Sequence, residues 1–268
     1  MRRRRCWNCC SAEMRAVPDG TRRHRFVQGL SGALAWLACI LSPAQAADIH
    51  VACASNFTTT LEKLAAAFER GEPHRLRISS GSTGKLYAQI RHGAPFDIFL
   101  AADRERPALL HAQGLSDTPV VYAIGRLALY APSGEPRTRL ERGVFAHLAI
   151  ANPRTAPYGT AARSVLEGMA LWDGLQPRLV IGENIGQTFH FVHSGNAELG
   201  FVALAQLRAL DIPPDRYWAV PVERHAALEQ AAALLHGGRA PEAARRFLDY
   251  LRGGTARGVI EKDGYQVP

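Results

Sequence analysis

A cluster of small hydroxyl and glycine residues at positions 79–84, Ser-Ser-Gly-Ser-Thr-Gly, has the composition of an anion-binding site. It follows a short apolar segment at 76–78 and precedes helical spacing that continues to about His92. The first N–H groups of a helix lack partners inside it and lie at the positive end of its dipole, so they attract anions. The hydroxyls of Ser82 and Thr83 would add donors there, although either could simply cap the helix.

The same stretch does not match a nucleotide-binding P-loop. That motif requires four residues between its glycines and Ser or Thr directly after its lysine. Here two residues separate Gly81 from Gly84, and Leu86 follows Lys85. Lys85 therefore receives no phosphate-binding role, and whether its charge attracts an anion stays open.

Three other places combine an apolar strand, a pair of small or polar residues and the start of a helix. They are Ser55-Asn56, Tyr158-Gly159 and Ile185-Gly186. In open α/β sheets, ligands bind at the carboxyl ends of the parallel strands. Four helix starts could therefore surround one buried oxyanion with neutral donors, each charge-assisted hydrogen bond contributing about 1.5–3 kcal/mol. Such a pocket would reject an anion that carries a proton.

The elements that must position these junctions alternate between strand and helix, which predicts an α/β fold with mostly parallel sheets. The interruption at 132–143, which is rich in Pro, Gly and charged residues, and the return at 218–222 suggest two lobes joined by two crossing segments. We expect lobe 1 to comprise 48–128 and 220–268, and lobe 2 to comprise 129–219, with a ligand in the cleft between them. The spacing also predicts a surface loop at 132–143 and a helix at 226–235.

The net charge of +8 comes mainly from one end of the chain. Eight of the 32 Lys and Arg residues but two of the 24 Asp and Glu residues lie in positions 1–47, so the remainder carries about +2. The remainder has no basic stripe interleaved with aromatic residues, which argues against nucleic acid as a partner.

Residues 1–47 have the features of a secretory signal peptide that is removed. Arginines at 22, 23 and 25 precede an apolar run at 30–41, and the small residues at 44–46 predict cleavage after Ala46 or Ala47. Translation could instead start at Met14, and Arg22-Arg23 could belong to a twin-arginine signal. Cys39 could carry a lipid. The other cysteines of this segment are removed with it, so Cys53 alone remains and is expected in the core.

The rest of the chain resembles the periplasmic molybdate-binding proteins of ABC importers over nearly its whole length. The stretches that carry the resemblance are Ala54-Ser55-Asn56-Phe57, Ser80-Gly81-Ser82-Thr83-Gly84, Gly93-Ala94-Pro95-Phe96-Asp97-Ile98-Phe99, Ala101-Ala102-Asp103, Asn152-Pro153, Ala156-Pro157-Tyr158-Gly159 and Leu199-Gly200-Phe201-Val202-Ala203.

The resemblance implies a two-lobed type II periplasmic-binding-protein fold and a function in the periplasm. The protein would capture molybdate, or tungstate, which the sequence does not distinguish from it, by hinge closure and deliver it to a membrane permease with a cytoplasmic ATPase. It would act as a monomer, without a cofactor or direct metal ligands, since molybdenum is bound as the oxyanion. The implied ligand-binding residues are Ser55, Asn56, Thr83 with the adjacent Ser82, Tyr158 and Ile185.

Two departures from the family pattern concern hydroxyl groups. Thr83 stands where Ser is usual, which keeps the hydroxyl but adds a methyl group. Ala203 stands where one branch of the family has a binding Tyr, and Tyr158 stands where that branch has Ala. The chain therefore resembles the other branch, with Tyr158 supplying the phenol.

Other functions remain as alternatives. The ligand could be another oxyanion such as sulfate, or the chain could be the sensing domain of a regulator. An enzyme is not expected, because no Gly-x-Ser-x-Gly or His-Glu-x-x-His motif occurs. His190 and His193 could share a metal but lack an evident third ligand. Asp97 and Asp103 are expected to stabilise the structure rather than to act as acid and base.

Overall fold

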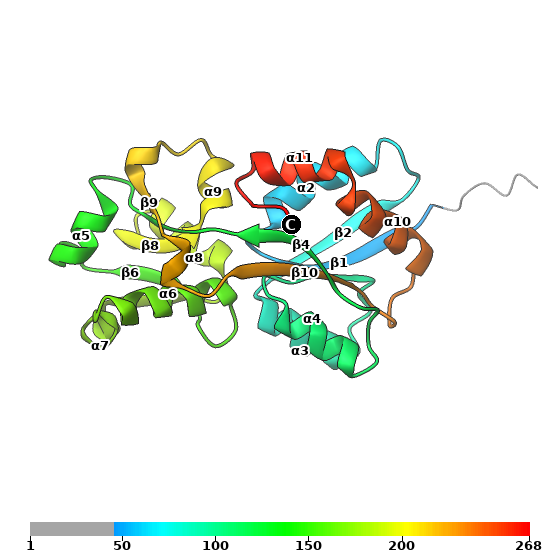
Figure 1. Cartoon of the computed structure of the whole chain (residues 1–268), viewed down its shortest axis with the longest axis horizontal. Helices are drawn as coiled ribbons and strands as arrows, with labels where there is room; N and C mark the ends of the chain where they lie inside the picture. Colours follow the sequence, from blue (N-terminus) through cyan, green and yellow to red (C-terminus); the bar gives the residue numbers. More distant parts are fainter. Residues whose placement is uncertain (1–45) are drawn as a thin grey trace, which may run out of the picture. The chain divides into compact units, whose positions relative to one another are not determined.

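Two five-stranded sheets form the framework of residues 46–268, the part of the chain that this computed structural model describes (Figure 1). Of the signal peptide predicted at 1–47, positions 1–45, which include its cysteines, lie outside the described residues. The first sheet has the order β2 (Arg75–Gly81), β1 (Asp48–Ala54), β3 (Ile98–Leu100), β10 (Leu228–Leu234) and β4 (Val120–Gly125). The second has the order β7 (Leu179–Gly182), β6 (Leu148–Ala151), β8 (Leu199–Ala203), β5 (Leu127–Tyr130) and β9 (Tyr217–Ala219).

One strand in each sheet runs against the others. In the first sheet β10 pairs antiparallel with both β3 and β4, while β1 is parallel to β2 and β3. In the second sheet β5 pairs antiparallel with β8 and β9, while β6 is parallel to β7 and β8. Each sheet is thus mixed but mostly parallel in strand direction, and its parallel strands end at one common edge.

Helices cover the faces of each sheet. Around the first sheet lie α2 (Thr58–Phe68), α3 (Thr83–Arg91), α4 (Glu105–Ala112), α10 (Pro241–Arg252) and α11 (Gly254–Lys262). The second sheet is accompanied by α5 (Pro136–Arg142), α6 (Pro157–Gly168), α7 (Trp172–Leu175), α8 (Ile185–His193) and α9 (Leu204–Arg208). Short 3-10 helices occur at Gln176–Arg178, Pro214–Arg216 and Val222–Arg224.

Strand β1 shows why the sequence folds into layers. Val51 and Cys53 point to one face and pack in a cluster with Leu61 of α2 and Phe247 of α10. Ala52, between them, points to the opposite face, in a cluster supplied by α3 and α4. A strand covered on both faces needs apolar residues at successive positions, which explains its near-continuous apolar sequence. Cys53 is a buried core residue, as predicted.

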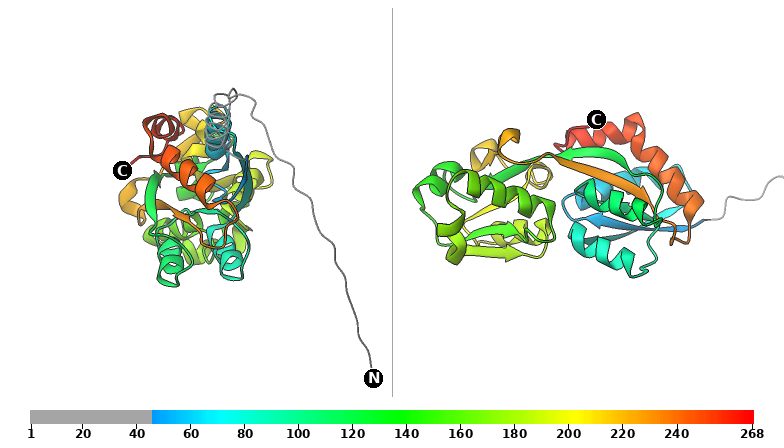
Figure 2. Two further views of the ribbon diagram at one scale, coloured as in Figure 1. Left: turned by 90° about the vertical axis from the view of Figure 1, so that its right-hand side faces the viewer. Right: turned by 60° about the horizontal axis from the view of Figure 1, so that its bottom comes forward.

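Two segments connect the sheets (Figure 2). Only Arg126 separates the end of β4 from the start of β5, so the chain passes almost directly from the first sheet to the second. It returns between Ala219, the end of β9, and Leu228, the start of β10. The outgoing and returning strands pair with each other in both sheets, since β4 pairs with β10 and β5 with β9.

The predicted helix at 226–235 is wrong, because residues 228–234 form strand β10. Its three consecutive alanines favour a helix locally. In the fold, the segment lies between β3 and β4 and pairs with both, and it is buried along most of its length. Tertiary pairing therefore overrides the local preference.

The predicted loop at 132–143 is wrong in part, because it contains the helix α5. Pro136 occupies the first turn, where its missing N–H costs nothing, and Gly143 ends the helix with a left-handed φ of 67°.

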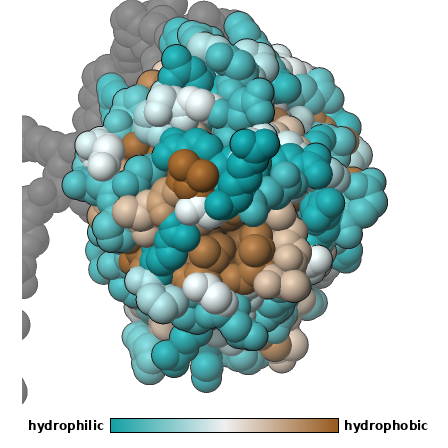
Figure 3. Space-filling view, turned by 90° about the vertical axis from the view of Figure 1, so that its left-hand side faces the viewer, coloured by the Kyte–Doolittle hydropathy of each residue, from teal (hydrophilic) through white to brown (hydrophobic). Residues whose placement is uncertain are grey.

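Near α5 and α7, the end of the second lobe shows an apolar patch within a hydrophilic surface (Figure 3). Within residues 46–268, no helix is long and apolar enough to cross a membrane.

Candidate anion-binding site

The four predicted junctions meet around one small cavity of about 10 Å³, roughly the room that a single water molecule occupies. The two lobes therefore stand closed, and a larger ligand could enter only after they separate. The structure brings all six predicted site residues together in the lining. The lining residues are Ala54, Ser55, Asn56, Gly81, Ser82, Thr83, Ala102, Ala156, Pro157, Tyr158 and Ile185.

Ser55, directly after β1, connects the two lobes. Its Oγ accepts a hydrogen bond of 3.2 Å from the backbone N–H of Gly186, in the first turn of α8. Its own backbone N–H donates to the carbonyl of Gly81 at the end of β2, at 3.0 Å. Since the Oγ acts as an acceptor toward Gly186, the hydroxyl proton of Ser55 remains available for a ligand.

Ser82 and Thr83 differ in what their hydroxyls do. Ser82 is the N-cap of α3 with extended backbone angles, yet its side chain makes no capping hydrogen bond. Ser82 is 2 % exposed, and its Oγ has no partner among the described residues. The Thr83 Oγ1, by contrast, accepts the backbone N–H of Ala102 at 3.2 Å and fixes the loop after β3. A buried polar group without a partner calls for an explanation, and a ligand supplies one.

Tyr158 lies in the first turn of α6. Pro157 precedes it and has no N–H, so Tyr158 provides the first backbone donor of this helix. Its phenol oxygen accepts a hydrogen bond of 3.3 Å from Nε2 of Gln230. Burial raises the pKa of this phenol well above its ordinary value, so the group stays neutral and keeps its proton.

The structure leaves room for this phenol at Gly125, the last residue of β4. A Cβ atom at position 125 would lie 2.2 Å from the Tyr158 hydroxyl oxygen and 2.7 Å from Nε2 of Gln230. Only glycine therefore permits the ring and the amide to occupy their places beside the crossing strand.

Ile185, the first residue of α8, lines the cavity. The N-cap Asn184 accepts the N–H of Gln187 through its side chain at 3.0 Å, and Gly186 donates to Ser55. The N–H of Ile185 precedes the helical hydrogen bonds and needs a partner outside the helix. Its side chain is buried, at 3 % exposure, so its apolar character suits the wall of the cavity.

Asn56 belongs to a buried network that was not predicted. Its Nδ2 donates to Oε1 of Gln230 at 3.0 Å and to the Tyr265 hydroxyl at 3.3 Å. The Tyr265 hydroxyl donates in turn to the Asn56 carbonyl at 2.7 Å, and the Tyr122 hydroxyl donates to Gln230 at 3.1 Å. The Oδ1 of Asn56 has no partner among the described residues. One signal in the sequence was available: Gln230 is a polar residue within an apolar run.

Within residues 46–268, no charged side chain lines the cavity. Lys85 on α3 instead forms an ion pair with Glu183, just before α8, at 2.8 Å. Both side chains are about half exposed, so this pair joins the lobes at the surface rather than in the site. A backbone hydrogen bond from Gly84 to the carbonyl of Thr155, 2.8 Å long, adds a further contact between the lobes.

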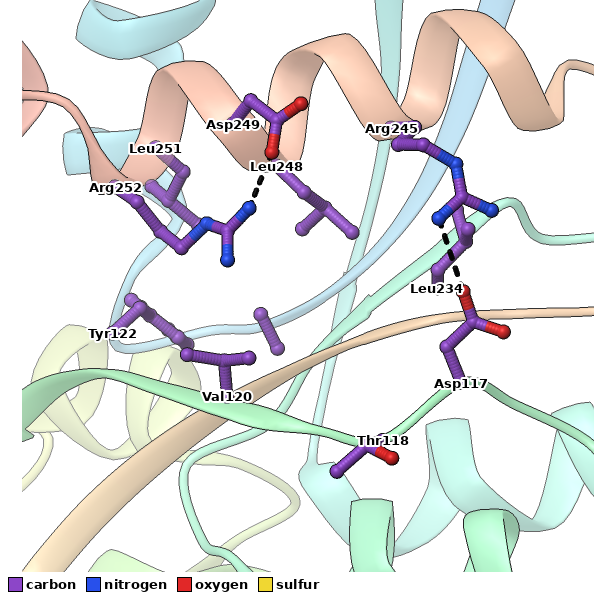
Figure 4. A pocket seen from close by; sticks show the side chains of 11 residues that line it. Asp117, Thr118, Val120, Tyr122, Leu234, Arg245, Leu248, Asp249, Leu251 and Arg252 are labelled. Carbon is purple, nitrogen blue, oxygen red and sulfur yellow. Dashed lines mark hydrogen bonds and ion pairs between the residues drawn. The ribbon is translucent and has the colours of Figure 1, made fainter.

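A larger hollow of about 210 Å³ lies elsewhere, between α10 and strands β4 and β10 (Figure 4). Its two arginines are already paired, Arg245 with Asp117 and Arg252 with Asp249. None of the predicted site residues lines it. Because its charges are neutralised by neighbours, it offers an anion less than the small cavity does.

Two carboxylates that the sequence singled out, Asp97 and Asp103, accept hydrogen bonds from backbone N–H groups. Buried Asp97 accepts the backbone N–H groups of His50 and Ala240, both at 2.7 Å, and thereby ties β1 to the start of α10. Asp103 accepts the N–H of Arg106 at 3.1 Å. The pKa of its carboxyl is raised, mainly because the group is buried. In the described part of the chain, no three His, Cys, Asp or Glu side chains are grouped to hold a metal.

Comparisons with known proteins relate this chain to a family. The model of the family "Bacterial extracellular solute-binding protein" matches residues 49–266. The molybdate-binding protein ModA of Azotobacter vinelandii is 40 % identical over 248 residues, covering 90 % of this chain and 96 % of that protein. The molybdate-binding protein ModA of Rhodobacter capsulatus is 35 % identical over 240 residues, covering 87 % and 94 %.

A solved structure agrees with the sequence comparisons. The periplasmic molybdate-binding protein of Azotobacter vinelandii superimposes with a TM-score of 0.79 at 36 % identity. The match covers 82 % of this chain and 99 % of that protein. The likeness therefore extends over both sheets, because the covered residues span nearly the whole described part.

Proposed function

The chain belongs to the bacterial extracellular solute-binding proteins, and we propose that it binds molybdate in the periplasm and delivers it to an ABC importer. It has the two-lobed type II binding-protein fold that its sequence predicted. One observation carries the proposal. The Ser82 hydroxyl, which has no partner among residues 46–268, and the starts of three helices converge on a cavity that no charged group of these residues lines. The chain is also 40 % identical to a molybdate-binding protein.

The donors suit a tetrahedral dianion. The hydroxyls of Ser55, Ser82, Thr83 and Tyr158 would hydrogen-bond its oxygens. The backbone N–H groups of Tyr158 and Ile185 would add two further donors. Each charge-assisted hydrogen bond contributes about 1.5–3 kcal/mol, and helix dipoles add attraction without a counter-charge. Tungstate has the same shape and charge as molybdate, so both should bind. No catalysis, cofactor or direct metal ligand is part of the proposal.

Closure is the proposed mechanism of capture. Lobe 1 (48–128 and 220–268) would bind the anion first, and lobe 2 (129–219) would rotate over it about the two crossing segments. The contacts of Ser55 with Gly186, of Gly84 with Thr155 and of Lys85 with Glu183 would form on closing. The closed monomer would then be recognised by the permease, whose ATPase lies in the cytoplasm.

A protonated oxyanion such as hydrogen phosphate is the second candidate ligand. The observation that favours it is the Oδ1 of buried Asn56, which has no partner in the described part of the chain, because an acceptor in the wall suits a ligand that carries a proton. Against it stands the excess of donors among the lining groups.

Calorimetric titration of the purified protein decides between these ligands. We expect tight binding of molybdate and tungstate, and weak or no binding of sulfate and phosphate. Tight binding of sulfate or phosphate, or the absence of molybdate binding, would refute the proposal.

A further inference from the structure

Gln230 is a fully buried polar residue in a strand that is otherwise almost entirely apolar. Its exposed fraction is 0 %, and it lies in β10, the strand that brings the chain back into the first sheet. The pairing of β10 with β4 shifts register between Gln230 and Ala231, so the strand is irregular at this residue. Bulges of this kind redirect a side chain, and they occur often beside functional sites.

The partners of Gln230 fix the orientation of its amide. Its Oε1 accepts from Asn56 Nδ2 at 3.0 Å and from the Tyr122 hydroxyl at 3.1 Å. Its Nε2 donates to the Tyr158 hydroxyl at 3.3 Å. Rotating the amide by half a turn would place the NH₂ group against the Asn56 NH₂ donor. The network therefore holds the donating side of Gln230 toward Tyr158.

This orientation decides what the phenol of Tyr158 can do. A phenol has one proton to donate, and here its oxygen already accepts the hydrogen bond from Gln230. Within residues 46–268, no acceptor is hydrogen-bonded to the phenol proton. The proton is thereby left for an oxyanion, and the hydrogen bond from Gln230 engages one lone pair of the phenol oxygen.

Gln230 also connects the site to both crossing segments. Asn56 follows β1, and Tyr122 belongs to the outgoing strand β4. Tyr158 lies on α6, beside the second sheet, and Gln230 itself lies on the returning strand. One amide thus links the first lobe, the second lobe and the segments between them.

We propose that Gln230 is a positioning residue that keeps the Tyr158 phenol as a donor to the bound oxyanion and so contributes to the selection of anions without a proton. The inference rests on the proposed function, since it assumes that an oxyanion occupies the cavity. It predicts that the hydrogen-bonding character of residue 230, rather than its volume, controls affinity.

The substitution Gln230→Glu tests this prediction with almost no change in shape. An ionised Glu cannot donate, so the phenol would donate to it and turn away from the ligand, beside a new negative charge. We expect molybdate affinity to fall at least about tenfold where Glu is ionised, and to recover as the pH falls and Glu becomes protonated. Burial raises the pKa of such a carboxyl, so calorimetry should cover roughly pH 5.5 to 9.

Gln113→Glu is the matched control, because Gln113 is exposed at the C-terminal end of α4 and its side chain donates to the Tyr87 hydroxyl at 3.2 Å. Its affinity should equal that of the wild type at every pH. Tyr158→Phe combined with Gln230→Glu should lose less than the sum of the two single losses, because both changes affect one donor.

Tyr122→Phe provides a second variant if Gln230→Glu does not fold, which thermal unfolding will show. It removes one of the two donors that orient Gln230 and adds no charge, so a loss of about threefold to tenfold is expected. Three results would overturn the inference. The first is wild-type affinity in the folded Gln230→Glu variant at pH 9, and the second is a loss of affinity that does not change with pH. The third is that the losses of Gln230→Glu and Tyr158→Phe add up in the double variant. Failure of the wild type to bind molybdate would instead refute the proposed function.

Discussion

Ser82→Ala should change affinity and stability in opposite directions. The Oγ of Ser82 is buried and has no partner among the described residues, so the ligand-free protein loses no hydrogen bond on its removal. We expect the free energy of unfolding to stay the same or to rise by up to about 1 kcal/mol, because an unsatisfied buried group disappears. The bound anion loses one charge-assisted hydrogen bond of about 1.5–3 kcal/mol, which raises Kd roughly 10-fold to 150-fold.

Calorimetry with molybdate measures the affinity, and thermal unfolding with and without molybdate measures the stability. Ligand stabilisation grows as the logarithm of the ligand concentration over Kd, so the variant should gain less stability from a given concentration. Thr83→Val is the matched comparison. Its hydroxyl accepts the N–H of Ala102, so its removal should destabilise the free protein by about 1–3 kcal/mol. Unchanged affinity in Ser82→Ala, or a clear loss of stability without ligand, would contradict this reasoning.

Three further substitutions test the site and the closed state. Tyr158→Phe should weaken molybdate binding by about 1.5–3 kcal/mol in calorimetry, and an unchanged Kd would exclude the phenol from the site. Gly125→Ala should weaken binding at least about tenfold, since its Cβ would displace the phenol; Gly174→Ala, with nothing within 4 Å, should bind normally. Lys85→Gln should weaken binding by at most about 1 kcal/mol, and less at high salt, because its ion pair with Glu183 is half exposed. A loss above tenfold would place Lys85 in the site.

The lining of the cavity could be predicted from the sequence because the signal is local. A strand that ends in small or hydroxyl residues directly before a helix determines where backbone N–H groups lack partners. Ser55, Ser82 and Tyr158 could therefore be predicted to line a site from the local sequence, without knowledge of the residues that contact them in the fold. The layered α/β class follows in the same way, from apolar runs that alternate with helical spacing.

Strand β10 marks the limit of that local information. Its alanines favour a helix, and only the pairing with β3 and β4, both distant in sequence, makes it a strand. With the strand unrecognised, the role of Gln230 could not be predicted. Its hydrogen bond with Asn56 joins residues 174 positions apart, and no spacing within one element encodes such a contact.

The sequence by itself thus determined six of the residues that line the cavity, since helix starts and strand ends are set by neighbouring residues. The tertiary structure decided what each group does there. The Thr83 hydroxyl accepts the N–H of Ala102, whereas the Ser82 hydroxyl has no partner among residues 46–268. Lys85 pairs with Glu183 from the other lobe. Hydrogen bonds and ion pairs of this kind depend on distances between separate elements, and those distances exist only once the two sheets have formed and closed on each other.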